Sequence, residues 1–231
     1  MNKNLTIAID GPSGAGKSTV AKALARRLHI MHLDTGAMYR TVAVALAEKG
    51  INPADEEAVL KALPKLCLEL RFRDGEQQNY ADGVNFNSRL RTPEASMGAS
   101  NVSRYPAVRR RLVALQQEWA KSQSFVLDGR DIGTVVLPHA SAKFYLDARA
   151  EVRARRRFLD LQNCHSTQTY AEVLADVLRR DAQDMGRQDS PLRQAEDACY
   201  LDSSELSEGE VIELMMAKLR ELGLIGKTQN V

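Results

Sequence analysis

A glycine-rich stretch near the start of the chain carries the residues best suited to chemistry. From Gly11 to Ser18 the spacing G-x-x-x-x-G-K-S is complete, between an apolar run at residues 5–9 and a segment of helical periodicity. Glycines let the backbone pass close to a phosphate, and the N–H groups that open a helix form an anion site. This order of strand, loop and helix predicts a P-loop that binds a nucleoside triphosphate.

Two side chains of this loop have predicted roles of their own. The ammonium group of Lys17 can reach the β- and γ-phosphates, and the hydroxyl of Ser18 can ligate Mg²⁺. The motif indicates the nucleotide and leaves open what is done with it. The rest of the expected nucleotide-binding set is the loop itself: Gly11, Pro12, Ser13, Gly14, Ala15, Gly16 and Thr19.

The composition is that of an ordinary globular protein. The chain has 231 residues, of which 44% are hydrophobic and 27% charged, with a net charge of +2. This net charge gives no global case for nucleic acid or a membrane surface as a partner, and no apolar run is long enough to cross a bilayer. Three distant cysteines without a CxxC pair fit a cytoplasmic location: Cys67, Cys164 and Cys199.

Apolar runs alternate with helical segments along most of the chain. The expected fold class is therefore α/β, a three-layer P-loop fold with a central parallel sheet. In such sheets ligands lie at the carboxyl ends of the strands. The P-loop, a turn at residues 34–36 and the segment 128–131 should share that rim. Residues 66–86 differ, because LELRFR alternates with period two before an Asp74-Gly75 turn, which predicts a small antiparallel insert.

Arginines are the second informative residue type. Several flanking a P-loop are typical of a clamp for phosphate. Arg180, Asp184 and Arg187 share one helical face by spacing, although a surface ion-pair ladder explains that spacing equally well. The D-x-x-G and N-K-x-D strings of regulatory GTPases are missing from the sequence. A phosphotransferase acting on an ionised phosphate would need positioning and charge neutralisation, and no general base.

Four stretches together resemble the bacterial cytidylate kinases among P-loop nucleoside monophosphate kinases. They are LTIAIDGPSGAGKST, LDTGAMYR, the run DGRDIGTVV at residues 128–136, and RRDAQDMGR. The resemblance covers essentially the whole chain. It implies the reaction ATP + CMP ⇌ ADP + CDP, with Mg²⁺ as cofactor and dCMP as a further acceptor, and a small antiparallel insert that binds the acceptor.

The resemblance also implies roles for individual residues. Thr35 would meet the acceptor nucleotide, Arg40 its phosphate, and Arg130 and Arg187 would hold phosphate and act with Lys17 in catalysis. The cytosine and sugar contacts that it implies are Ser100, Arg109 and Asp131 for the base, and Arg180 and Asp184 for the sugar.

By the same resemblance the basic helix from about Arg149 is a lid over ATP, with Arg157 in contact with it. Its arginines should repel one another, so we expect this segment to order and close only with nucleotide. The chain would form a single monomeric domain in three parts. These are a core (residues 1–62, 104–148 and 179–231), an acceptor-binding insert (63–103) and a lid (149–178).

Two alternatives remain open at this point. The first is another small-molecule P-loop kinase, acting on UMP, dTMP or shikimate. The second is an RNA-binding protein that uses ATP as a switch, suggested by the arginines at 153–157; only 5% aromatic residues and no base-stacking motif argue against it. Asp128 ends an apolar strand either as a metal-site acid or as a turn former before Gly129.

Overall fold

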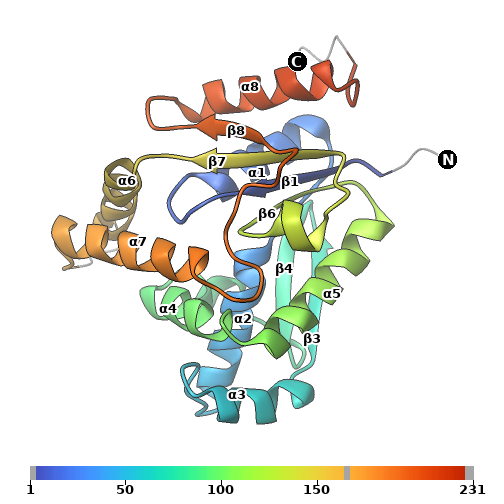
Figure 1. Cartoon of the computed structure of the whole chain (residues 1–231). Helices are drawn as coiled ribbons and strands as arrows, with labels where there is room; N and C mark the ends of the chain where they lie inside the picture. Colours follow the sequence, from blue (N-terminus) through green and yellow to red (C-terminus); the bar gives the residue numbers. More distant parts are fainter. Residues whose placement is uncertain (1–3, 164–166, 227–231) are drawn as a thin grey trace. The chain divides into compact units, whose positions relative to one another are not determined.

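The computed structural model describes residues 4–163 and 167–226, and the chain falls into two compact units. The first unit is Met1–Ile30 with Ser124–Val231, and the second is Met31–Gln123. Figure 1 labels the helices and most of the strands of both units. Among the described residues, no helix combines the length and apolar character needed to cross a membrane.

A five-stranded sheet has the order β2-β6-β1-β7-β8, and the first unit contributes its last four strands. β1 pairs in parallel with β6 and β7, so that Asp10 lies opposite Gly129 and Tyr145. This register brings the start of the P-loop level with the end of β6. The strand bounds in this unit are β1 Thr6–Asp10, β6 Phe125–Gly129, β7 Ala142–Asp147 and β8 Cys199–Asp202.

The α-helices in the described part of the first unit are α1 Lys17–Leu28, α6 Ala150–Asn163, α7 Tyr170–Met185 and α8 Glu208–Glu221. Ile7, Leu24 and Met215 are fully buried in one core between the sheet and the helices α1 and α8. The capping boxes that open α7 and α8 are formed by Thr169 with Glu172 and by Ser207 with Glu210. A π-helical turn, Ile132–Val136, follows β6.

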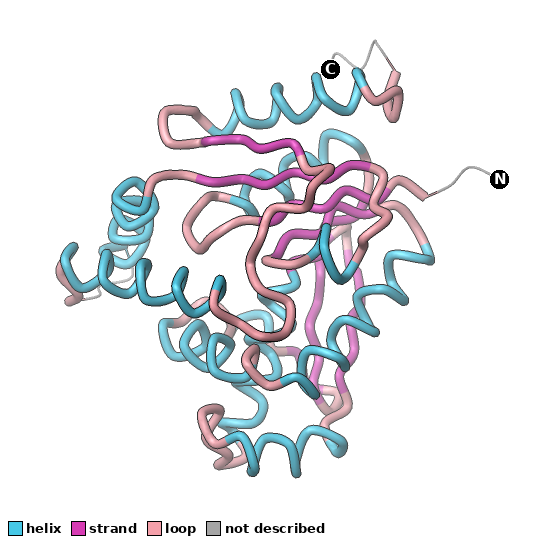
Figure 2. Tube along the Cα trace, viewed as in Figure 1, coloured by secondary structure: helices cyan, strands magenta, loops and turns pink. Residues whose placement is uncertain are grey.

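The second unit holds a three-stranded antiparallel sheet in the order β3-β4-β5, drawn in magenta in Figure 2. The predicted turn at Asp74 and Gly75 has positive φ at both residues, as a tight hairpin requires. The bounds in this unit are β2 Met31–Asp34, α2 Thr35–Glu48, α3 Glu56–Ala62, β3 Leu68–Arg73, β4 Glu76–Ala81, β5 Val84–Asn85, α4 Pro93–Val102 and α5 Pro106–Ser122, with 3₁₀ turns at Leu63–Lys65 and Asn87–Arg89.

The predicted fold class is confirmed, with a central parallel sheet and a small antiparallel sheet. The turn expected at residues 34–36 is wrong. Thr35 already belongs to α2, because the carboxylate of Asp34 accepts a hydrogen bond from Ala37 N at 2.9 Å and caps the helix. The division by role into core, insert and lid stays a prediction. In the structure, residues 31–62 and 104–123 belong to the same compact unit as the insert.

Candidate functional site

The P-loop has the backbone conformation that its glycines predict. Gly11 has φ 149°, and a Cβ placed on it would lie 1.9 Å from the carbonyl oxygen of Leu146 on β7. Gly14 has φ 81°, and a Cβ there would come within 3.1 Å of Arg153 Cβ on α6. Only glycine therefore fits at Gly11 without moving backbone. The N–H groups at the start of α1, which begins at Lys17, are those that a phosphate would use.

Lys17 is buried within this loop, with 6% of its surface exposed. Its Nζ donates a hydrogen bond to Pro12 O at 2.6 Å. Burial, and then the positive charge of Arg130, lower the pKa of Lys17 well below its usual value, while Asp128 and Asp184 act in the opposite direction. The ammonium group thus lies in a place where an added anion would be strongly stabilised.

The side-chain oxygens of Ser18 and Asp128 lie next to each other in the site. The hydroxyl of Ser18 donates to Asp128 Oδ2 at 2.6 Å, across 110 residues of sequence. Asp128 is buried at the end of β6. A hydroxyl beside a carboxylate is a donor set that suits Mg²⁺, which takes few protein ligands and prefers oxygen. This contact argues against the interpretation of Asp128 as merely a turn former.

Asp184 is the centre of a buried charge cluster, with 1% of its side chain exposed. Arg130 Nε donates to Asp184 Oδ2 at 2.8 Å, and Arg187 pairs with Oδ1. Burial raises the pKa of Asp184, but Arg130, Arg187 and Arg180 outweigh it and hold that pKa below the usual value. The two arginines that contact Asp184 therefore share a buried carboxylate, unlike the members of a surface ion-pair ladder.

Asp10 was not recognised from the sequence, although it directly precedes the P-loop. Its carboxylate accepts hydrogen bonds from Ile132 N and Gly133 N, each at 2.7 Å. Burial raises its pKa to about 7, even though these two amides lower it. Asp10 thereby fixes the turn that follows Arg130 and Asp131. Asp131 is buried, and its carbonyl accepts from the amides of residues 135 and 136.

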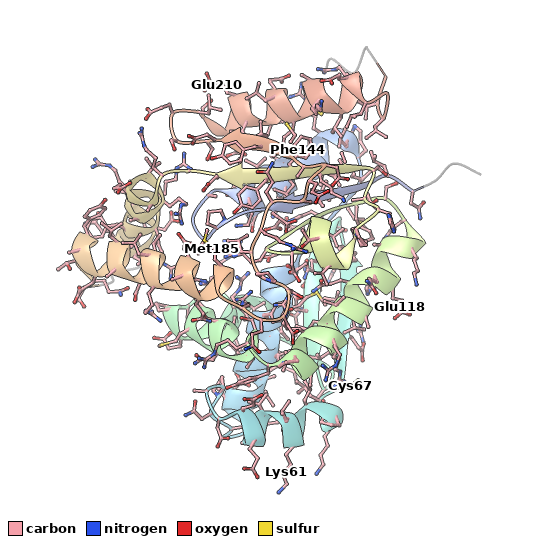
Figure 3. All side chains as sticks on the ribbon, viewed as in Figure 1. Lys61, Cys67, Glu118, Phe144, Met185 and Glu210 are labelled. Carbon is pink, nitrogen blue, oxygen red and sulfur yellow. The ribbon has the colours of Figure 1, made fainter. Side chains whose placement is uncertain are left out.

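Arg153 was expected to lie among mutually repelling arginines, and the structure instead gives it partners of its own. It is buried, and its guanidinium donates to Ala148 O at 2.7 Å and to Ser13 O at 3.1 Å. It also pairs with Asp181 at 2.7 Å. Asp181 lies on α7, the helix whose end is marked by the Met185 label in Figure 3. Arg153 thus connects the P-loop with α6 and α7.

Two further arginines of α6 and its start also have partners. Arg149 pairs with Glu205, and Arg156 donates to Ser203 Oγ at 3.2 Å and to Ser203 O at 2.6 Å. Mutual repulsion along this helix is therefore largely compensated by nearby acceptors. Arg157, expected at ATP, is half-buried on α6.

In the second unit α2 carries Thr35 and Arg40. Thr35 is buried in the first turn, and Arg40 Nη2 pairs with Asp34 Oδ2 at 2.7 Å. A Cβ on Gly36 would lie 3.1 Å from Asp34 Oδ1 and 3.2 Å from Arg40 Nη1. The missing side chain at Gly36 therefore gives the guanidinium room to fold over the carboxylate of the helix cap.

Ser100 and Arg109 are linked through a third residue. The hydroxyl of Ser103 donates to Ser100 O at 2.9 Å, and Arg109 Nη1 donates to Ser103 O at 3.4 Å. Arg109 is 5% exposed, and its guanidinium carbon lies 5.8 Å from the centre of the Tyr39 ring. The end of α4 and the start of α5 therefore present a serine and a buried cation close together.

A sequence model of the cytidylate kinase family matches residues 7–221 of the chain. The chain belongs to the cytidylate kinase family. The cytidylate kinase of Caldicellulosiruptor bescii is 45% identical over 214 residues, covering 93% of this chain and 95% of that protein. That of Geobacter sulfurreducens is 46% identical, covering 95% and 94%. An uncharacterized protein of Eubacterium ventriosum of known structure has a TM-score of 0.54 at 12% identity, covering 94% and 98%, a likeness of fold alone.

Within this cytidylate kinase family member, each unit gathers part of the predicted set. The first unit joins Arg130, Asp184 and Arg187 in one cluster, whose charges also act on Lys17. The second unit holds Thr35 and Arg40 on α2, and it links Ser100 with Arg109 through Ser103. Asp10, Arg153 and Asp181 are the additions that the structure makes to the sequence-based set.

Proposed function

We propose that the protein transfers the γ-phosphoryl group of ATP to CMP, forming ADP and CDP, and that dCMP is also accepted. The observation that carries this proposal is the match to the cytidylate kinase family over residues 7–221. The buried P-loop lysine and the arginine cluster around Asp184 supply the chemistry such a reaction needs.

The phosphate end of the reaction is assigned to the first unit. The P-loop amides would hold the phosphates of ATP, and Lys17 would exchange its bond with Pro12 O for a phosphate oxygen. A phosphate next to the buried ammonium group would raise the pKa of Lys17. Phosphate binding and protonation of Lys17 would therefore favour each other. Arg130 and Arg187 would then neutralise charge that spreads over the transferred group.

Mg²⁺ would be held through Ser18 and Asp128, whose oxygens already lie within 2.6 Å of each other. The ion supplies neutralisation of phosphate charge when it is bound. The hydrogen bond to Asp128 fixes the direction of the Ser18 hydroxyl and keeps both oxygens side by side. The sequence predicted Ser18 for this role and left open whether Asp128 shares it.

The acceptor needs recognition and no activation, because the phosphate oxygen of CMP is already ionised near neutral pH. Arg40 would contact that phosphate, with Thr35 beside it on α2. Arg109, Ser100 and Asp131 would hold the cytosine, and Arg180 with Asp184 the sugar. A buried guanidinium such as Arg109 discriminates strongly, because a nucleotide whose base cannot accept from it forgoes a hydrogen bond in a site shielded from water.

We further propose that the protein acts in the cytoplasm as a monomer and that α6 and the segment after it cover ATP, with Arg157 as a contact. Measuring ADP release with CMP, dCMP, UMP, AMP, dTMP and shikimate tests the assignment. The proposal expects the highest kcat/KM with CMP, and dCMP next. A preference for UMP, dTMP or shikimate would assign the protein to a different acceptor.

A further inference from the structure

We infer that Gln77, on strand β4, is a positioning residue for the acceptor phosphate, because its carboxamide holds the main chain of Asp34 and thereby aims Arg40. The inference rests on the proposed function, in which Arg40 contacts that phosphate. Gln77 lies 43 residues from Asp34 in sequence. All the residues involved belong to the second unit.

The Gln77 carboxamide contacts Asp34 as a neighbouring strand would. Asp34 N donates to Gln77 Oε1 at 2.7 Å, and Gln77 Nε2 donates to Asp34 O at 3.2 Å. Both backbone polar groups of Asp34, at the junction of β2 and α2, are therefore satisfied by one side chain. Partly buried backbone groups need such partners, and removing this one would free the junction to move.

The side chain of Asp34 carries this constraint on to Arg40. Asp34 Oδ1 accepts from Ala37 N at 2.9 Å and Oδ2 pairs with Arg40 at 2.7 Å. The carboxylate thus has both oxygens occupied and a fixed direction. Arg40 Nε is buried and has no hydrogen-bond partner among the described residues. The guanidinium is held through Nη2 by Asp34, so its orientation depends on the position of the Asp34 carboxylate.

Gln77 is itself fixed by a chain of amides in the hairpin. Its Nε2 also donates to Asn79 Oδ1 at 2.8 Å, and Asn87 Nδ2 donates to Gln77 O at 2.6 Å. Asn79 is buried, and its own Nδ2 donates to Asn87 Oδ1 at 3.0 Å. Each amide therefore has its orientation set by the next. The antiparallel insert acts through this network as a rigid support for the start of α2.

The test is the substitution Gln77→Leu, which keeps the size of the side chain and removes both bonds to Asp34. We expect the KM for CMP to rise on the order of tenfold, while the KM for ATP stays within about twofold. Gln78→Leu is the matched control, because Gln78 is the next residue of β4 and its side chain accepts from the exposed Asn85 Nδ2 at 2.9 Å, without a bond to Asp34 among the described residues. Its KM for CMP should match that of the wild-type protein.

Partial unfolding of a variant lowers the apparent kcat and leaves KM unchanged, so KM is the deciding quantity. Gln77→Glu provides a second variant, since it retains the acceptor and loses the N–H donor that bonds Asp34 O. A CMP KM equal to wild type in either Gln77 variant, or an equal rise in Gln78→Leu, would overturn the inference.

A double-mutant cycle with Arg40→Met separates positioning from general support of the fold. If Gln77 acts through Arg40, Gln77→Leu adds nothing to the CMP KM of the Arg40→Met protein. Independent, multiplicative effects would mean a structural role and contradict the inference. If Arg40→Met itself leaves the CMP KM unchanged, the proposed role of Arg40 fails; if Arg40→Met raises it and Gln77→Leu does not, only the role of Gln77 fails.

Discussion

The two compact units hold their functional cations in different ways. In the first, Arg130 and Arg187 share the buried carboxylate of Asp184, and the charges of this cluster act on the buried Lys17. In the second, Arg40 pairs with Asp34, whose main chain is held by the neutral carboxamide of Gln77. Arg109 contacts the carbonyl oxygen of Ser103 and the ring of Tyr39. Removing a charge should therefore affect the chemical step most in the first unit. Changes in the second unit should mainly affect acceptor affinity.

The largest effect is expected from Lys17→Met. This variant removes a buried charge while retaining most of the side-chain volume, so the fold should remain intact. We expect kcat to fall on the order of a thousandfold or more, because the charge of Lys17 is the one proposed to neutralise the β- and γ-phosphates directly. Single-turnover kinetics together with circular dichroism would measure both properties. Near-normal turnover by the folded variant would contradict the kinase assignment.

The next effect concerns stability and pH in the first unit. The pKa of Asp10 is about 7 in the fold and 3.8 ordinarily, so the folded protein binds this proton more tightly. Protonation of Asp10 therefore raises the free energy of unfolding by about 4 kcal/mol. This contribution is complete below pH 4 and is lost as pH rises to about 7. Urea unfolding at several pH values should show that slope, and Asp10→Asn should flatten it.

Asp197→Asn is the control for this measurement. Asp197 is an exposed carboxylate whose bond with Lys143 lowers its pKa. Its contribution to the free energy of unfolding therefore changes mainly below pH 4, outside the range in which Asp10 titrates. An unchanged slope in Asp10→Asn would show that Asp10 stays ionised throughout, held by the amides of Ile132 and Gly133.

A smaller and more selective effect is expected from Arg109→Ala and Asp131→Ala. Each should raise the KM for CMP by roughly ten- to a hundredfold, because a base-reading site loses heavily when one buried partner is missing. Binding of an ATP analogue, measured by calorimetry, should change much less. Equal losses for both ligands would mean that these residues support the fold and do not read the base.

The smallest effect distinguishes the two ends of α6. Arg153 and Arg156 tie its first turns to Ser13, Asp181 and Ser203. Hydrogen exchange should therefore show residues 150–156 protected without nucleotide, with added protection on binding CMP and a non-hydrolysable ATP analogue only from about residue 158 onward.

Arg153→Lys should reduce the protection of residues 150–156, whereas the exposed Arg155→Lys should not. If the whole helix became protected only with nucleotide, the original expectation of a closing lid from about residue 149 would be correct and Arg153 would not anchor it.

Local sequence patterns predicted much of the fold, because their signals act over a few residues. The loop from Gly11 to Ser18 and the Asp74-Gly75 hairpin each depend on neighbours within a few residues. The resemblance to the family extended this to the candidate residues, whose roles stay predictions. Spacing alone could not distinguish a phosphate clamp from a surface ion-pair ladder at Arg180, Asp184 and Arg187. The burial of Asp184, which separates the two, cannot be seen in the sequence.

The chain by itself therefore determined which groups are available: a lysine and a serine on a phosphate loop, a set of arginines, and an insert. The tertiary structure decided which groups hold them in place. Asp10 bonds residues 122 positions away, Arg153 reaches 140 positions to Ser13, and Gln77 reaches 43 positions to Asp34. Such contacts leave no periodic or local signal, because they arise only when packed strands and helices bring distant backbone groups within hydrogen-bond distance.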